Sequence, residues 1–248
     1  MLFFLAWRDV LVRYKQAALG IAWAVLRPLL TTLVFTLVFG KIARLPSGEI
    51  PYILLVLSGM TPWLYFATTL SESGNSLVSN SALITKVYFP RLVVPVSAVI
   101  ANLVDLVITA LLLCVMLVWF GVGVSWQIVL VPVVFIVLAM LTIGAGLWVA
   151  ALNARYRDIS FVLPFFVTFG LYLSPIGFAS SAIPEKWRTL YGLNPIVGVV
   201  DGFRYALFGD QYSFQPWTLA YAFMLALTLI LTGIRYFRSV ERDLVDVL

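Results

Sequence analysis

Charged side chains at the edges of apolar stretches are the residues of this sequence with the clearest chemical use. Cations at a membrane surface bind anionic headgroups, with about 1 kcal/mol for each cation. The cations before and at the edge of the first apolar stretch are Arg8, Arg13, Lys15 and Arg27. Asp105 is the one acid well inside a stretch, where acids usually face protein or water. We expect Asp105 to act in the gating or packing of a pathway through the protein. Alternatively, it caps a neighbouring helix or forms a local hydrogen bond with Asn102 or Thr109.

Residue types that the sequence lacks exclude several chemistries. It has no His and a single Cys, Cys114, within an apolar run. Disulfides, Cys/His zinc sites and His-based acid–base catalysis are therefore excluded. The sequence also has no GxxxxGK[ST] phosphate loop, so this chain is expected to hydrolyse no ATP through one. We predict no catalytic residues, no metal site and no cofactor in this chain.

Six long apolar stretches must position these charges. Each is near or above the ~20 residues that a helix needs to cross a bilayer. Their ranges are 21–40, 50–70, 95–120, 126–152, 159–179 and 217–237. Only 11% of the residues are charged, against about 25% in a soluble domain, so too little polar sequence remains to cover six buried core helices. We therefore predict an all-α, polytopic membrane protein with six transmembrane helices in a single domain.

The distribution of cations predicts the orientation of these helices. With the N-terminus inside, the inside segments hold 11 of the 16 Lys and Arg residues. The positive-inside rule then places both termini in the cytoplasm. Because the cations are scattered among the spans and form no continuous stripe, the net charge of +5 does not indicate nucleic-acid binding.

Residues 1–19 are predicted to form an amphipathic helix in the inner membrane interface. At about 100° per residue, one side carries Phe3, Trp7, Val10, Leu11, Tyr14 and Ala18. The other side carries Arg8, Asp9, Arg13, Lys15 and Gln16, interrupted by Leu5 and Val12. An aromatic face opposite a basic face is typical of interfacial helices. The alternative is a frayed start of the first span.

Two inner segments are rich in polar residues. Residues 71–94 are expected to form a loop with a short helix that ends at Phe89-Pro90, because the residue before proline avoids the α region. With an exposed aromatic residue and two cations, Lys86 and Arg91, this segment offers a docking surface for a cytoplasmic partner. Residues 153–158 are short and dense in charge. Alternatively, both are solvated turns whose cations only set the topology.

The outer segment 180–216 is too apolar for a plain solvated loop. Pro184, Asn194-Pro195 and Gly209-Asp210 divide it into two short helices. We expect both to be re-entrant helices that cap an exit path, since backbone at membrane depth is tolerated where it lines a cavity or is buried in protein. A flat amphipathic lid is the alternative. The residues of this outer gate are Trp187, Tyr191, Asn194, Pro195, Phe203 and Arg204.

The polar segments also carry an ordered set of family motifs. The set consists of Arg8-Asp9, Arg13-Tyr14-Lys15, Leu19-Gly20, Trp23, Arg27-Pro28, Ser58-Gly59, Pro62-Trp63, Asn80, Leu83-Ile84, Lys86, Phe89-Pro90-Arg91, Asn153, Tyr156-Arg157-Asp158, Leu193-Asn194-Pro195 and Gly202-Phe203-Arg204. In this order the chain resembles the permeases of ABC-type polysaccharide exporters over nearly its whole length. The run 89–95 looks more like O-antigen exporters than capsule exporters.

This resemblance implies a homodimer paired with two copies of a separate ABC ATPase, which binds ATP and Mg²⁺. The implied cargo is a lipid-linked polysaccharide such as O antigen, capsule or teichoic acid, moved outward across the inner membrane. The N-terminal cations would then bind the pyrophosphate of that lipid as well as phospholipid. The residues implied to contact the ATPase are Asn80, Leu83, Lys86, Phe89, Pro90, Arg91, Asn153, Arg155, Tyr156, Arg157 and Asp158.

A polysaccharide conduit would use aromatic rings, because stacking on sugar faces tolerates variation along a sliding polymer. The candidate rings are Phe35, Phe39, Trp63, Phe66, Phe165, Phe166, Phe169 and Tyr172. Lipid-facing helices carry such rings too.

Two other functions share the predicted fold. An ABC permease for a small lipid or drug would have the same span count, although a basic interfacial helix argues mildly against it. An ion-coupled secondary transporter would need several intramembrane ionisable groups or paired broken helices, and Asp105 alone is a poor relay.

Overall fold

Helices make up the described part of the chain. The computed structural model describes residues 2–15, 22–86 and 89–247, except for the side chains of 84–86 and 242–247. No strand occurs within these ranges. Five of the described helices are long and apolar enough to cross a membrane, namely Ala22–Ile42, Tyr52–Ser79, Val93–Trp119, Trp126–Arg155 and Pro216–Glu241. The chain is therefore an all-helical, multi-pass membrane protein.

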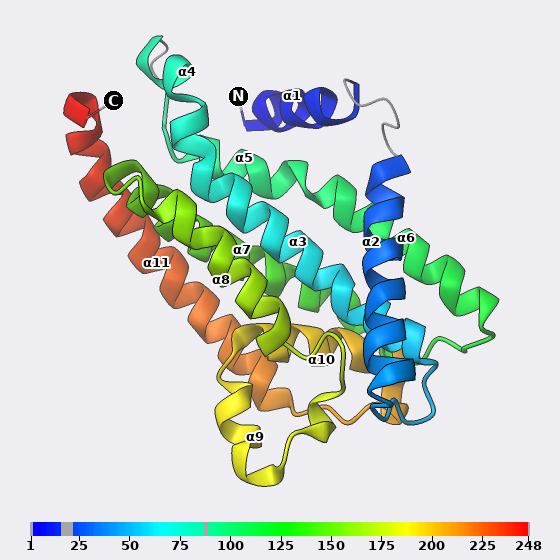
Figure 1. Ribbon diagram of the computed structural model, residues 1–248. Helices are drawn as coiled ribbons and strands as arrows, with labels where there is room; N and C mark the ends of the chain where they lie inside the picture. The colour runs from blue at the N-terminus through cyan, green and yellow to red at the C-terminus, as the bar shows by residue number, and fades with distance from the viewer. Residues whose placement is uncertain (1, 16–21, 87–88, 248) are drawn as a thin grey trace.

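The helices group at two ends of the molecule. In chain order they are α1 (Leu2–Lys15), α2 (Ala22–Phe35) with a π-helical continuation (Thr36–Ile42), α3 (Tyr52–Ser79), α4 (Ser81–Lys86), α5 (Val93–Ala101), α6 (Leu103–Trp119), α7 (Val131–Arg155), α8 (Ile159–Leu173), α9 (Glu185–Gly192), α10 (Pro195–Phe208) and α11 (Pro216–Val247). Figure 1 shows α1, α4 and the C-terminal end of α11 at one end, here called the α1 end. α9 and α10 lie at the opposite end, the α9 end (Figure 1). α1 lies crosswise to α2.

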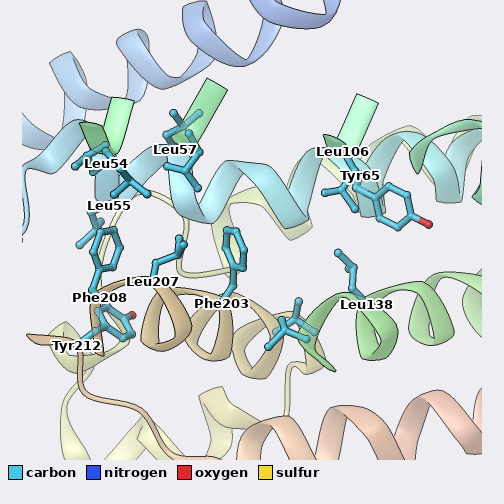
Figure 2. Packing of buried hydrophobic residues seen from close by; sticks show 14 of the residues in the cluster. Leu54, Leu55, Leu57, Tyr65, Leu106, Leu138, Phe203, Leu207, Phe208 and Tyr212 are labelled. Carbon is cyan, nitrogen blue, oxygen red and sulfur yellow. The ribbon is translucent and has the colours of Figure 1, made fainter. Parts of the chain in front are cut away.

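α3 is the most deeply buried of the five long helices described. Its N-terminal half packs against α6, α7 and α10 in one apolar cluster, shown in Figure 2. The residues labelled there are Leu54, Leu55, Leu57, Tyr65, Leu106, Leu138, Phe203, Leu207, Phe208 and Tyr212. α10 thus packs within the core, and its position depends on the helices around it.

α3 also extends well beyond its expected end. The sequence predicts a loop from residue 71, but the helix continues to Ser79. Three serine hydroxyls in this extension donate to backbone carbonyls of the preceding turn, as Ser71 does to Ala67 at 2.9 Å. Small residues let the extension approach α7, where a Cβ on Gly146 would lie 2.5 Å from Ser73 Oγ. Burial against α7 therefore keeps a polar segment helical.

Three other boundaries differ from those predicted. The stretch 95–120 begins earlier, at Val93, and is interrupted at Asn102 between α5 and α6. α8 ends at Leu173 because Ser174 precedes a proline and has extended backbone, with φ −104° and ψ 154°. α11 continues past residue 237 to Val247. The fifth apolar stretch thus contains a helix of only 15 residues, α8.

Candidate functional site

A polar cluster joins α1 to α3 and α6 near the α1 end. The guanidinium of Arg13 donates to both carboxylate oxygens of Glu72 at 2.7 Å and to one carboxylate oxygen of Asp105. It also donates to the side-chain carbonyl of Asn102 at 2.8 Å. The amide of Asn102 in turn donates to Glu72 at 2.7 Å. One cation therefore holds two acids that belong to different helices. We call Arg13, Tyr14, Glu72, Asn102 and Asp105 the polar cluster.

Tyr14 completes this cluster, since its hydroxyl donates to the second carboxylate oxygen of Asp105. Burial raises the pKa of the Tyr14 hydroxyl, and the bond to Asp105 raises it further. Burial lowers the pKa of Arg13, but the charges of Glu72 and Asp105 outweigh this effect and raise it above its ordinary value. Arg13 and Tyr14 therefore remain hydrogen-bond donors throughout the physiological pH range.

The orientation of α1 explains how these residues meet. Leu5 and Ala6 are buried, and Leu5 packs in a cluster with Phe89 and Val94. Phe3 and Trp7, by contrast, are 75% and 53% exposed. On the side that the sequence assigns to cations, Arg8, Asp9 and Arg13 are partly buried against the protein, whereas Val12 and Lys15 are exposed. The interruption of that side by Leu5 is an apolar contact. Residues 16–19 of the predicted interfacial helix lie outside the described residues.

Two cavities border the polar cluster. The first, here called the α2 cavity, has a volume of about 290 Å³ and lies between α1, α2, α3 and α6. Its lining includes Trp23, Arg27 and the hydroxyl-bearing residues Thr61, Thr68 and Thr109. The second, the α1 cavity, has a volume of about 570 Å³ and lies along α1 and the extension of α3. Arg13 and Glu72 line both cavities, so their ion pair stands between them.

The other predicted cations differ in whether their side chains already have hydrogen-bond partners within the protein. Arg8 donates to Asp9 at 2.7 Å and to the side chain of Asn80 at 2.9 Å. Arg27 is exposed at the α2 cavity, and within the described residues its guanidinium has no hydrogen-bond partner. Lys15 is also exposed. Of these cations, Arg27 is best placed to meet an anion inside a cavity.

The comparison with known families decides which class of protein holds this site. Over residues 1–208 the sequence matches the family described as ABC-2 type transporter. That range contains the whole polar cluster and both cavities. This chain belongs to the ABC-2 type transporter family.

Relatives of this ABC-2 permease include polysaccharide exporters. The O-antigen export system permease protein RfbA of Myxococcus xanthus is 30% identical over 206 residues, which cover 82% of this chain and 78% of the relative. A protein of the same description from Klebsiella pneumoniae is 27% identical over 97% of this chain and 92% of its own. The polysialic acid transport protein KpsM of Escherichia coli is 26% identical over 94% and 91%.

The first predicted coupling segment of the permease is only partly exposed. Phe89, expected to be an exposed aromatic residue, is buried in a core with Leu77 and Phe237, and Leu83 packs against that core. Arg91 donates to the carbonyl of Glu241 in α11 at 2.9 Å. These side chains are held by the chain's own contacts, whereas Pro90 is exposed. The side chain of Lys86 lies outside the described residues.

The second predicted coupling segment divides into a buried and an exposed part. Asn153 is buried and donates at 3.0 Å to the carbonyl of Gly74, which ties α7 to α3. Arg155 to Asp158 are all exposed at the end of α7 and in the turn after it. The guanidinium of Arg155 lies 5.5 Å from the ring centre of Tyr156. This cation–aromatic pair is the clearest free docking feature among the coupling residues.

At the α9 end of the permease, 180–216 contains two short helices, as the sequence predicts. Asn194 caps α10, because its side chain accepts from the backbone N–H of Ile196 at 3.0 Å, and Pro195 opens the helix. Trp187 on α9 is 54% exposed, whereas Phe203 and Arg204 on α10 are buried. These two residues belong to the core and offer no surface to a passing ligand.

Arg204 binds three segments together. It donates to the carbonyls of Leu55 at 2.8 Å and of Ile176 and Phe178 at 3.1 Å. It also donates at 3.2 Å to the hydroxyl of Tyr212, which donates to Asp201 at 2.6 Å. The start of α3, the segment after α8 and helix α10 therefore share one buried guanidinium.

The predicted conduit rings fall into two groups. Trp63 is buried and faces Gly170 of α8. Its ring centroid lies 5.9 Å from that of the partly buried Phe66. The other rings contact one another along α2 and α8, and those of α8 are exposed. This second group is Phe35, Phe39, Phe165, Phe166, Phe169 and Tyr172. Among these rings, those of α8 are the most exposed.

Glu72 and Tyr14 are site residues that the sequence did not single out. Glu72 falls in a segment that was expected to be a loop, and Tyr14 falls on the predicted apolar face. A usable signal existed, because an acid inside an apolar stretch, Asp105, requires a cationic or donor partner. Arg13 is such a cation, but only the fold shows that the two meet.

Proposed function

We propose that this permease exports a lipid-linked polysaccharide, with O antigen favoured, across the inner membrane. It works as a homodimer with two copies of a separate ABC ATPase that binds ATP and Mg²⁺. The observation that carries this proposal is the extent of the match to O-antigen export permeases, up to 97% of this chain. By comparison, the inner membrane transport permease YadH of Escherichia coli matches over 34% of this chain.

The proposed topology has six spans, with α8 as the fifth and both termini in the cytoplasm. In its favour, the apolar cluster that contains Leu5, Phe89, Ala154 and Phe237 brings the expected inside segments to one end. Glu72 lies about 30 Å along α3 from Tyr52 at 1.5 Å per residue, which is the thickness of a bilayer core. The polar cluster then lies at inner headgroup depth, with α1 in the interface and α9 and α10 as re-entrant helices at the exit.

The α2 cavity is the proposed site for the diphosphate of the cargo lipid. Arg27 supplies an unpaired cation there, and Thr68 supplies a hydroxyl donor. The hydroxyls of Thr61 and Thr109 already donate to the backbone carbonyls of Leu57 and Asp105. Arg8 and Lys15 attract phospholipid or cargo headgroups toward the site from α1.

This function is tested with the permease–ATPase complex reconstituted in lipid vesicles. Lipid-linked O polysaccharide should stimulate ATP hydrolysis and reach the far leaflet, where an antibody to the sugar detects it. A short-chain lipid or a drug should do neither. Stimulation by the drug without polymer transfer would contradict the proposal and favour a small-molecule permease.

We expect the exposed turn after α7 to contribute to ATPase docking. Replacing Arg155 with Glu and Tyr156 with Ala removes an aromatic anchor and reverses a charge. Affinity for the ATPase should fall at least about tenfold, which corresponds to ~1.4 kcal/mol, as measured by co-purification at graded detergent concentrations.

A matched control exists at the opposite end of the permease. Lys186 lies 5.5 Å from the ring centre of Trp187, the same spacing as in the coupling pair. The variant Lys186→Glu, Trp187→Ala should retain the ATPase. Equal retention by both variants would refute the placement of the docking surface.

Polymer transport should depend on the exposed rings of α8 collectively. Stacking contacts along a sliding polymer are weak and similar, so each of Phe165→Ala, Phe169→Ala and Tyr172→Ala should leave partial export. The triple variant should reduce surface polysaccharide per inserted permease severalfold. Trp119→Ala on α6, which removes a ring that is 82% exposed, should leave this ratio unchanged. A triple variant with full normalised export would exclude these rings from the path.

A further inference from the structure

Two of the contacts that attach α1 to the rest of the chain differ in kind. In its N-terminal half, Leu5 and Ala6 are buried against the core. In its C-terminal half, Arg13 and Tyr14 reach the acids of α3 and α6. Only the second contact stands between the two cavities. A ligand in the α2 cavity therefore meets the polar contact and leaves the apolar one intact.

The polar contact is open to exchange. The side chains of Arg13, Glu72 and Asp105 are 27%, 39% and 29% exposed. An anion in the α2 cavity can therefore reach all three side chains. Moreover, two carboxylates share one guanidinium, which leaves one excess negative charge in the polar cluster. Arg27 is a further cation in the wall of the same cavity.

A diphosphate is a stronger partner for Arg13 than either carboxylate. It carries more negative charge than a single carboxylate, and its phosphate oxygens can accept two hydrogen bonds from a guanidinium, as a carboxylate does. We propose that the polar cluster is a latch opened by the diphosphate of a membrane lipid. The diphosphate binds between Arg27 and Arg13 and forms an ion pair with Arg13. The ion pairs of Arg13 with Glu72 and Asp105 then break, and the diphosphate repels both carboxylates. The C-terminal half of α1 then leaves α3.

Opening this latch has two structural consequences. Because Arg13 and Glu72 line both cavities, their separation joins the α2 cavity to the α1 cavity. In addition, Arg8 on the same helix holds Asn80, the residue that precedes α4. Movement of α1 is thus transmitted to the segment proposed to contact the ATPase. The latch rests on the proposed function for the lipid-linked source of the diphosphate.

The test measures the position of α1 in the whole permease–ATPase complex. Spin labels are placed at Leu11→Cys on α1 and Val78→Cys at the end of α3, since both side chains are exposed. The exposed native Cys114 is replaced with Ser. The distance between the two labels is measured by pulsed electron paramagnetic resonance in three samples. These are phosphatidylcholine nanodiscs alone, the same nanodiscs with polyprenyl diphosphate, and the same nanodiscs with soluble inorganic diphosphate. Polyprenyl diphosphate should lengthen the distance by on the order of 10 Å, one helix width.

Variants separate a latch from a passive structural contact. Glu72→Gln with Asp105→Asn removes the competing charges and keeps the side-chain shapes, so α1 should occupy the released position without ligand. Arg13→Lys keeps a cation but loses the bidentate geometry of the guanidinium. The distance distribution of this variant without ligand should lie between those of the closed and the released positions. Asp9→Asn, which removes an acid on the same helix that is paired with Arg8, should leave the distance unchanged.

Three results would overturn the latch. The first is an unchanged distance in the wild-type complex with polyprenyl diphosphate. The second is a double acid variant that keeps the closed distance. The third is a full response to soluble diphosphate, which would make the source a free anion. Stimulation of ATP hydrolysis by lipid-linked polysaccharide, measured on the same samples, shows separately whether the proposed function holds.

Discussion

Replacing Arg204 with Met should cause the largest loss of stability of any single substitution discussed for this permease. The guanidinium is fully buried and satisfies three backbone carbonyls from two segments. Each orphaned buried acceptor costs about 1–3 kcal/mol, and loss of a buried charged partner costs about 3–5 kcal/mol. At ~2–4 °C per kcal/mol for a chain of this size, the unfolding midpoint of the purified permease in detergent should fall by about 10 °C or more.

Two further variants define the cause of this loss. Arg204→Lys keeps the charge but reaches fewer carbonyls, so its midpoint should lie between those of the wild type and the Met variant. Arg235→Met removes an exposed arginine from α11 and should change the midpoint little. If the Arg204 and Arg235 variants unfold at the same temperature, the network around α10 adds no stability.

Gly198→Ala should separate α10 from α11. A Cβ at this position would overlap the carbonyl oxygen of Thr218 and lie 2.5 Å from its carbonyl carbon. Backbone atoms cannot move aside as a flexible side chain does, so the two helices must shift apart. Overpacking of this kind costs about 1–3 kcal/mol. Inserted, folded permease should therefore decrease at a fixed expression level, as measured by size-exclusion chromatography of detergent extracts.

A neighbouring glycine on α10 provides the control. At Gly202 a new Cβ would meet its nearest atom, Leu219 Cδ2, at 3.4 Å, which is an ordinary contact. Alanine favours a helix over glycine by about 1 kcal/mol, so Gly202→Ala should be neutral or slightly stabilising. A Gly198 variant that behaves like the Gly202 variant would show that the α10–α11 contact tolerates a wider spacing.

Most of the membrane helices follow from local sequence, because apolar length alone predicts a span. The ends of the helices do not, because they depend on neighbours. Nothing local distinguishes the helical segment after Ser71 from a polar loop, since α7 stabilises it through the space left by Gly146. The short α8 is different, because Pro175 was visible in the sequence and explains its end.

The candidate site was predictable in composition but not in pairing. Arg13 and Asp105 were recognisable as unusual charges for their positions. Their meeting depends on how α1 folds back over α3 and α6, across 92 positions of sequence. Likewise, Phe89 and Arg204 carry residue types that suit an exposed contact or a gate, and only the surrounding core shows that both are internal.

If α8 is the fifth span, as proposed, its short length makes the permease sensitive to the thickness of the bilayer. Its 15 residues give an apolar length of about 22 Å, whereas a typical hydrocarbon core is about 30 Å thick. Such a hydrophobic mismatch makes the bilayer thin locally, at a fraction of a kcal/mol per Å. In the proposed topology, lipids beside the exposed rings of α8 are therefore expected to be compressed relative to those beside α7 or α11. Acyl-chain length thus becomes a variable that acts on the one helix whose rings are proposed to touch the polymer.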